Sequence, residues 1–164
     1  YILFGHSMGA TIFFELMHKI RENGLPSPLE FIAASSAAPN FHQVSDSYMY
    51  SLPEQEFIKY LLKISNIHQE LLDDDEFMGL VLPSIRADFQ MIETYRCNRT
   101  KRVSCDASVF YGESDDGMSE DSLNGWVDFF DAPKFEGFSG GHFFIDDSNS
   151  DVVLKINEIV SEYV

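Results

Sequence analysis

The sequence predicts an α/β fold in which a mostly parallel sheet is flanked by helices. Short apolar runs that are typical of buried strands alternate along the chain with amphipathic helical patterns. The first apolar run leads through a glycine-flanked turn directly into a helical pattern. A length of 164 residues, 45% of them hydrophobic, suits one globular domain with a core of its own.

The first strand and the first helix are expected at the start of the chain. The run YILF at residues 1–4 is strand-like, and from Ala10 the apolar residues recur at helical spacing. These apolar residues are Phe13, Phe14, Met17 and Ile20. Gly24 and Pro26 supply the stop signal for the helix. The run FIAASSAAP at residues 31–39 predicts the next strand, with small side chains.

The sequence predicts a helical insertion in the middle of the chain. Residues 52–95 show helical periodicity that is interrupted at Pro53, near Asn66 and at Pro83. The acidic segment LLDDDE at residues 71–76 lies between two helical pieces.

The last third returns to strands alternating with helices. The runs ASVFYG at 107–112 and KFEGF at 134–138 are strand-like, and residues 119–130 between them are expected to be helical. On that segment one apolar face is formed by Leu123, Trp126 and Phe130. A closing helix is marked by Val152, Val153, Ile156 and Val160.

Charge and cysteine usage exclude several classes of protein. With 27 acidic and 11 basic residues the formal net charge is −16, which opposes nonspecific binding to nucleic acid or to an anionic membrane. No run approaches the roughly 20 apolar residues of a membrane span. Cys97 and Cys105 lack CxxC spacing, so they are expected to be reduced, packed side chains in a cytosolic protein.

The segment GHSMG has the pattern G-x-S-x-G between a strand and a helix, which is the pattern of a nucleophile elbow. Such a turn forces Ser7 into strained geometry with its hydroxyl exposed, and a side chain at Gly5 or Gly9 is expected to collide with backbone. The N–H of Met8 at the helix start is a candidate oxyanion donor. The alternative is a serine that merely caps the helix.

A serine nucleophile needs a histidine and a carboxylate, here in the chain order Ser, Asp, His. His142, in FSGGHFF, follows the last strand and is the best candidate base for Ser7. Asp115 and Asp116 follow the strand that ends at Gly112, so either can be the acid that orients His142. The remaining histidines are expected at the surface or in packing contacts: His6, His18, His42 and His68.

Together these segments resemble the type II thioesterases, which are α/β-hydrolases that accompany nonribosomal peptide and polyketide synthases. The segments that carry the resemblance are FGHSMGA (4–10), LPEQEF (52–57), LPSIRADFQMIETYRC (82–97), VFYGESDDGMSEDSLNGW (109–126) and FSGGHFFI (138–145). The resemblance implies that residues 1–164 are the C-terminal portion of one α/β-hydrolase domain that lacks its N-terminal part. It also implies that residues 41–95 form a helical lid.

In function, the resemblance implies hydrolysis of acyl or peptidyl thioesters from the phosphopantetheine arm of a carrier protein. The acyl group passes through Ser7, the family spacing favours Asp115 over Asp116 as the acid, and no metal or organic cofactor is needed. A cytoplasmic enzyme that edits stalled assembly lines, monomeric when complete, is the expectation. The alternatives are a carboxylesterase or lipase acting on small esters, and a noncatalytic fragment that binds a carrier.

The basic segment RCNRTKR at residues 96–102 is a candidate docking site for an acidic carrier protein. The alternative is a solvated loop that balances nearby acidic residues.

Overall fold

The computed structural model describes residues 1–41, 48–64 and 74–164. The chain divides into two compact units. The first unit combines Tyr1–Phe41 with Cys97–Val164, and the second is His42–Arg96.

The second unit differs by one residue at each end from the insertion expected at 41–95, and its role as a lid stays a prediction. His42, His68 and the helix interruption expected near Asn66 lie outside the described residues. The first half of the acidic segment 71–76, residues 71–73, lies outside them as well.

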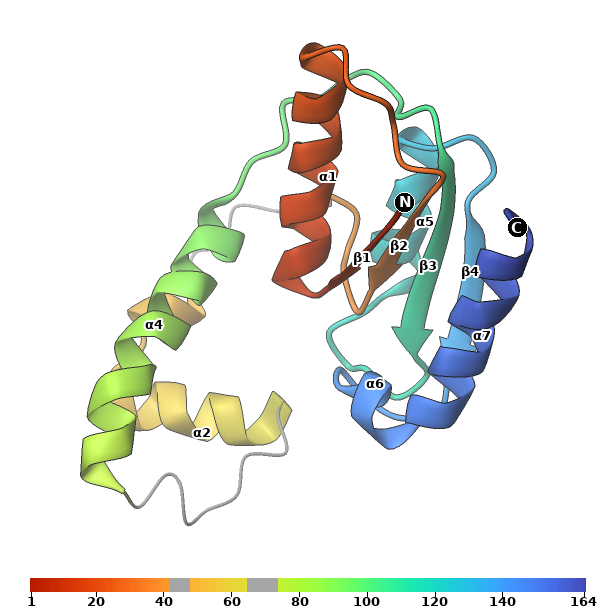
Figure 1. Ribbon diagram of the computed structural model, residues 1–164. Helices are drawn as coiled ribbons and strands as arrows, with labels where there is room; N and C mark the ends of the chain where they lie inside the picture. Colours follow the sequence, from red (N-terminus) through yellow and green to blue (C-terminus); the bar gives the residue numbers. More distant parts are fainter. Residues whose placement is uncertain (42–47, 65–73) are drawn as a thin grey trace. The chain divides into compact units, whose positions relative to one another are not determined.

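The first unit is built on a parallel sheet whose strand order is β1-β2-β3-β4 (Figure 1). The strands are β1 (Ile2–His6), β2 (Glu30–Ala34), β3 (Asp106–Gly112) and β4 (Lys134–Phe138). Successive strands pair in parallel, which requires a crossover segment between each pair. The α/β fold with a parallel sheet flanked by helices is therefore confirmed.

Helices cover both faces of this sheet (Figure 1). One face carries α1 (Met8–Glu22), α5 (Glu120–Asn124) and the 3₁₀ helix η2 (Gly125–Asp128), and the other carries α6 (Phe144–Asp147) and α7 (Asn149–Ser161). Alternate residues of β2 point to opposite faces, so that Phe31 and Ala33 join the first core whereas Ile32 and Ala34 join the second. A strand buried on both faces reads as a continuous apolar run.

Two expectations about these elements need correction. The strand expected over 31–39 ends at Ala34, because Ser35 has a φ of 46° and leaves the extended conformation. The helix expected over residues 119–130 is a short α-helix, Glu120–Asn124, that continues as a 3₁₀ helix to Asp128; its expected apolar residues Trp126 and Phe130 are buried and Leu123 is partly buried.

The closing helix expected near the end of the chain is confirmed as α7, and its buried face consists of Val152 and Ile159, with Ile156 packed beside them. These three residues are spaced i, i+4 and i+7, which places them on one side of the helix. The valines one position further along lie on the neighbouring side and face solvent.

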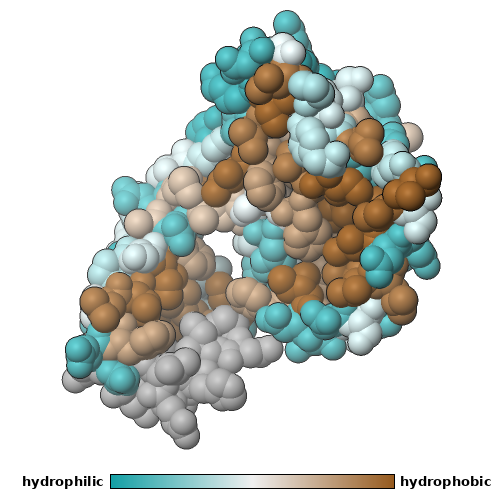
Figure 2. All heavy atoms as spheres, viewed as in Figure 1, coloured by the Kyte–Doolittle hydropathy of each residue, from teal (hydrophilic) through white to brown (hydrophobic). Residues whose placement is uncertain are grey.

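Helix α1 also has two distinct sides. It buries Phe14 and Met17 against the sheet, whereas Ile12 and Leu16 are 46% and 40% exposed. Figure 2 shows that hydrophobic residues reach the visible surface of the first unit among hydrophilic ones.

Among the described residues, β1 pairs with a strand on one side only.

The second unit contains the 3₁₀ helix η1 (Met49–Ser51) and the helices α2 (Glu54–Ile64) and α4 (Asp75–Thr94). Its own apolar cluster consists of Phe57, Leu61, Met78 and Leu82, with partly buried neighbours. The helix interruption expected at Pro83 is wrong, because α4 runs through that residue. Pro83 and Gly79 are both exposed, so water can satisfy the Gly79 carbonyl that has no N–H partner at position 83.

Two charged side chains of α4, Arg86 and Glu93, form hydrogen bonds with the backbone of η1 and of Leu52, the residue after it. Arg86 donates hydrogen bonds to the carbonyls of Tyr50 and Leu52, at 2.5 and 2.8 Å, and its guanidinium lies 4.3 Å from the centre of the Phe57 ring. The Glu93 carboxylate accepts hydrogen bonds from the backbone N–H groups of η1. The RADF segment, which begins at Arg86, therefore stabilises the second unit internally.

Candidate active site

The turn between β1 and α1 presents Ser7 in strained geometry. Its backbone has φ 53° and ψ −122°, a region that L-residues rarely adopt, and its N–H donates to the Ala34 carbonyl at 2.8 Å. A Cβ at Gly5 would lie 2.5 Å from the backbone nitrogen of Ala10. At Gly9 a Cβ would meet nothing within 4 Å, so the collision expected there is wrong.

The two glycines therefore make a matched pair of variants. Gly5→Ala is expected to lower the free energy of unfolding by about 3 kcal/mol, because backbone atoms cannot move aside as a flexible side chain can. Gly9→Ala is expected to leave it unchanged or to raise it by up to about 1 kcal/mol, since the residue is helical and faces open space. Urea unfolding of both variants measures the difference. Equal losses in the two proteins would contradict the steric argument.

The loops that follow β3 and β4 touch each other because a glycine stands at their contact. A Cβ at Gly112 would lie only 2.2 Å from the carbonyl oxygen of Gly141. The Ser114 N–H donates to the Gly140 carbonyl at 2.9 Å, and Gly140 has a φ of 119°, which favours glycine. This contact brings the loop that follows β3 to the loop that carries His142.

Three of the side chains predicted from the sequence meet at this edge of the sheet. His142 Nε2 lies 3.1 Å from Ser7 Oγ, and His142 Nδ1 lies 2.9 Å from Asp115 Oδ2. Asp116, the alternative acid, is exposed to solvent. The structure therefore brings together Ser7, His142 and Asp115, in the arrangement in which a base can take the proton of a serine hydroxyl.

The environment of Asp115 keeps its carboxylate ionised. Its side chain is only 5% exposed, and burial alone would raise the pKa. Hydrogen bonds from His142 and from the Gly117 N–H, the latter at 2.9 Å, outweigh burial and lower the pKa of Asp115 below its usual value. A charged carboxylate is therefore available to stabilise a protonated imidazole.

The first N–H of α1 belongs to Met8, the residue after Ser7. Among residues 1–41, 48–64 and 74–164, the structure shows no acceptor for this N–H. An unpaired N–H at a helix start can donate to an oxygen that becomes negative during attack by Ser7.

Two further residues reach the site that the sequence analysis did not assign to it. His6 Nε2 and Ser35 Oγ lie 2.8 and 2.7 Å from the backbone carbonyl oxygen of His142. The sequence signal for His6 was its position directly before Ser7 in the elbow. Ser35 carried no comparable signal, because its contact is made across the sheet.

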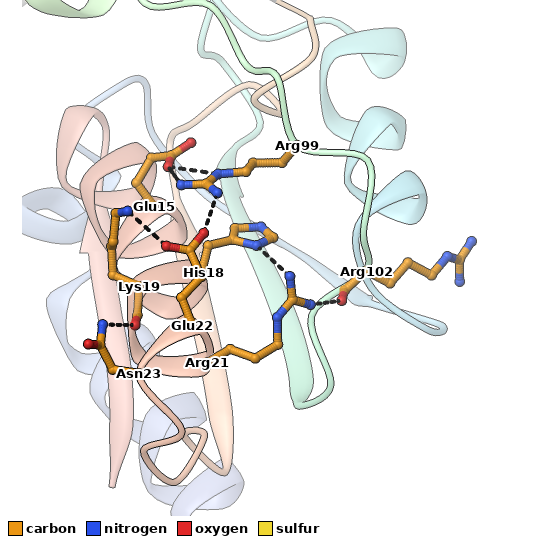
Figure 3. Close-up of polar contacts among 8 residues, drawn as sticks. All are labelled: Glu15, His18, Lys19, Arg21, Glu22, Asn23, Arg99 and Arg102. Atoms are coloured by element: carbon orange, nitrogen blue, oxygen red, sulfur yellow. Dashed lines mark hydrogen bonds and ion pairs between the residues drawn. The ribbon is translucent and has the colours of Figure 1, made fainter.

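His18 is a packing residue, as the sequence analysis expected. It is 1% exposed, its ring lies against Phe14, and its Nδ1 accepts a hydrogen bond from Arg21 at 3.2 Å (Figure 3). An arginine can only donate, so the proton of the neutral ring is on Nε2, which has no partner within the described part of the chain. Burial, followed by the charges of Arg21 and Arg99, lowers the pKa of His18; nearby Glu15 and Glu22 oppose the shift.

A buried neutral histidine makes stability depend on pH. Because the pKa of His18 is lower in the folded state, its contribution is complete above about pH 6.5 and is lost as the pH falls below that value. His18→Gln, which keeps an acceptor for Arg21, is expected to lose less free energy of unfolding between about pH 7.5 and pH 5.5 than the wild type. Urea unfolding at both pH values measures this, and parallel losses in the two proteins would refute it.

Two of the four basic residues in the segment 96–102 are paired with acidic side chains. Arg99 forms ion pairs with Glu15 and with Glu22, both at 2.7 Å, and so ties its loop to α1 (Figure 3). Arg102 pairs with Asp131. Lys101 is exposed.

The two cysteines are free and pack against the core of the first unit. Burial, reinforced by nearby acidic groups, raises the pKa of Cys105 to about 12, so its thiol stays protonated. In the described ranges, three or more His, Cys, Asp and Glu side chains nowhere gather in a way that could hold a metal ion. No helix of the described residues is long and apolar enough to cross a membrane.

Comparison with known proteins identifies the family of this chain. Residues 1–159 match the thioesterase domain family. The gramicidin S biosynthesis protein GrsT of Aneurinibacillus migulanus is 31% identical over 153 residues, which are 91% of this chain and 58% of that protein. A probable cadicidin biosynthesis thioesterase of Streptomyces griseus is 28% identical over 145 residues, covering 88% of this chain and 39% of that protein. The chain thus spans about half the length of these curated relatives.

Two solved structures share the fold of this chain. ClbQ of the colibactin NRPS/PKS pathway matches with a TM-score of 0.88 and 25% identity, over 99% of this chain and 69% of that one. YbtT, a type II thioesterase from the yersiniabactin NRPS/PKS pathway, matches with a TM-score of 0.80 and 27% identity, over 94% of this chain and 63% of that one. The resemblance to type II thioesterases is confirmed, and the chain belongs to the thioesterase domain family.

Proposed function

We propose that this domain hydrolyses acyl thioesters through an acyl-enzyme formed on Ser7. The observation that carries the proposal is the double contact of the His142 imidazole, 3.1 Å from Ser7 Oγ on one side and 2.9 Å from Asp115 on the other. A serine hydroxyl is a weak nucleophile unless a positioned base removes its proton.

In the first half of the reaction, His142 Nε2 takes the proton of Ser7, and Ser7 Oγ attacks the thioester carbonyl carbon. The carbonyl oxygen becomes negative and accepts a hydrogen bond from the Met8 N–H. The C–S bond then breaks, and the thiol leaves with the proton from His142. The acyl group is now an ester of Ser7.

In the second half, His142 takes a proton from a water molecule that attacks the ester carbonyl. The C–O bond to Ser7 breaks, Ser7 recovers its proton from His142, and a carboxylic acid is released. Asp115 stabilises the imidazolium that forms in each half, because its carboxylate is ionised and bonded to Nδ1. Only groups of the protein and water take part, and the proposal assigns no cofactor.

The substrate class that the relatives support is an acyl or peptidyl group on the phosphopantetheine arm of a carrier protein. Relatives of this chain are named for gramicidin S biosynthesis and for the NRPS/PKS pathways of colibactin and yersiniabactin. A role in removing stalled acyl groups, in the cytoplasm and as a monomer, follows the expectation from sequence. Residues 41–95 are assigned the role of a lid on the same basis.

The test compares substrates on the purified protein. We expect a higher kcat/KM for acyl-pantetheine thioesters than for oxygen esters with the same acyl groups. The reverse preference would favour the alternative of a carboxylesterase acting on small esters. Absence of turnover on both, together with retained binding to a loaded carrier protein, would favour a noncatalytic binding domain.

Docking of an acidic carrier protein can be tested at Lys101. Arg99 is unsuitable for charge reversal, because its two ion pairs hold the loop to α1. Lys101→Glu is expected to raise KM for a carrier-bound substrate about 1.4- to 5-fold, the effect of an exposed ion pair worth about 0.2–1 kcal/mol. KM for a small pantetheine thioester serves as the control and should not change. A KM for the loaded carrier equal to that of the wild type would remove Lys101 from the docking surface.

A further inference from the structure

The backbone carbonyl of His142 is held by two side chains from neighbouring strands. His6 Nε2 lies 2.8 Å and Ser35 Oγ 2.7 Å from its oxygen. His6 is the last residue of β1, and Ser35 directly follows β2. A carbonyl oxygen has two lone pairs, so these two donors satisfy its full capacity.

Ser35 is fixed by the sheet, and the His6 ring packs against the loop that carries His142. Ser35 is 1% exposed, and its N–H donates to the Phe110 carbonyl of β3 at 3.0 Å. Its positive φ of 46° turns the chain at the end of β2. The His6 ring lies 5.2 Å from the His142 ring and 5.4 Å from the Phe143 ring, measured between ring centres.

The chemistry of the contact determines the protonation of His6. A carbonyl oxygen only accepts, so the Nε2 of His6 carries a proton and donates it to this bond. Burial lowers the pKa of His6, which favours the neutral ring with its single proton on that nitrogen. Ser35 donates its hydroxyl proton to the same oxygen.

The local sequence of the His142 loop does not provide this restraint. Gly140 and Gly141 directly precede His142, and glycines allow many backbone conformations. The imidazole must nevertheless reach Ser7 Oγ and Asp115 Oδ2 at the same time. A displacement of about 1 Å in such an arrangement can cost about 100-fold in rate.

We propose that His6 and Ser35 are positioning residues that fix the backbone of His142, so that its imidazole is held between Ser7 and Asp115. The proposal rests on the proposed function, because it assigns His142 as the base. Neither residue touches the reacting atoms in this role; each acts through the His142 carbonyl.

The variants follow from the donor atoms. His6→Leu and Ser35→Ala each remove one donor, and the double variant removes both. His6→Gln is the conservative variant, since its side-chain amide nitrogen occupies a position along the chain similar to that of Nε2 and donates in the same way. His18→Leu is the matched control, because it removes a buried histidine of the same unit that does not contact the site.

Measurements of rate and of stability distinguish a positioning role of His6 and Ser35 from a role in folding alone. We expect His6→Leu to lower kcat for a small acyl-pantetheine thioester about 10- to 100-fold with little change in KM, and the double variant to lose more. His6→Gln should recover most of the rate. Labelling of Ser7 by a fluorophosphonate, in which the Ser7 oxygen displaces fluoride from phosphorus, should slow in parallel. His18→Leu should lower the unfolding temperature and leave the labelling rate of the folded protein unchanged.

Each outcome decides a different point. Wild-type labelling rates in both His6→Leu and the double variant overturn the inference, and so does a glutamine variant that is as slow as the leucine variant. If His6→Leu does not fold, Ser35→Ala decides alone: slower labelling supports the inference, and a wild-type rate overturns it. Failure of the proposed function is recognised separately, because the wild-type protein would then not be labelled at Ser7.

Discussion

Ser7→Ala is expected to lower kcat for an acyl-pantetheine thioester by about five to six orders of magnitude. The variant lacks the oxygen that forms the ester intermediate, and the remaining groups cannot replace it. His142 and Asp115 alone give no covalent path, although the Met8 N–H can still stabilise the direct attack of water. Single-turnover hydrolysis and mass spectrometry of the acyl-enzyme measure the loss.

The control for this variant is Ser161→Ala. Ser161 is an exposed residue of α7 whose hydroxyl donates to the Asn157 carbonyl within the same helix. The chemical change is identical, and kcat should equal that of the wild type. Near-ultraviolet circular dichroism should be the same for both variants. Hydrolysis by Ser7→Ala within tenfold of the wild-type rate would refute the assignment of Ser7 as nucleophile.

Asp115→Asn should lower kcat by about 10,000-fold, because the neutral amide neither stabilises the imidazolium nor selects the required tautomer of His142. The buried carboxylate is the partner of His142 Nδ1, and its pKa is held low by hydrogen bonds despite burial. Asp116→Asn makes the same chemical change at the next, exposed residue and is expected to keep nearly the full rate. Steady-state kinetics of the two variants measure the contrast.

The lowered pKa of Asp115 also has a consequence for the pH dependence of the wild type. Ionisation of Asp115 persists to lower pH than for a free carboxyl, so protonation of this carboxylate should not cause the first loss of activity on acidification. A greater loss of kcat in Asp116→Asn than in Asp115→Asn would move the role of the acid to Asp116.

Most strands and helices were predictable because their signals are local. The apolar runs at β2 and β3 and the helical spacing in α1 each lie within a few consecutive residues. The errors arose where the tertiary environment decides the conformation. Ser35 ends β2 early with a positive φ, and its hydroxyl bonds to His142. Helix α4 continues through Pro83 at a position where both Gly79 and Pro83 are exposed to water.

The sequence by itself determined the types and order of the candidate catalytic residues. Five consecutive residues around Ser7 specify the elbow, because a strand, a sharp turn and a helix start follow from near neighbours. The histidine after the last strand was identifiable in the same way. The family spacing already favoured Asp115 over Asp116, and the tertiary structure places Asp115 against His142. Tertiary structure alone decided that His6 and Ser35 hold the His142 carbonyl. These contacts join loops from four strands, so they depend on the register of the sheet and on the close approach at Gly112, neither of which is specified by nearby residues.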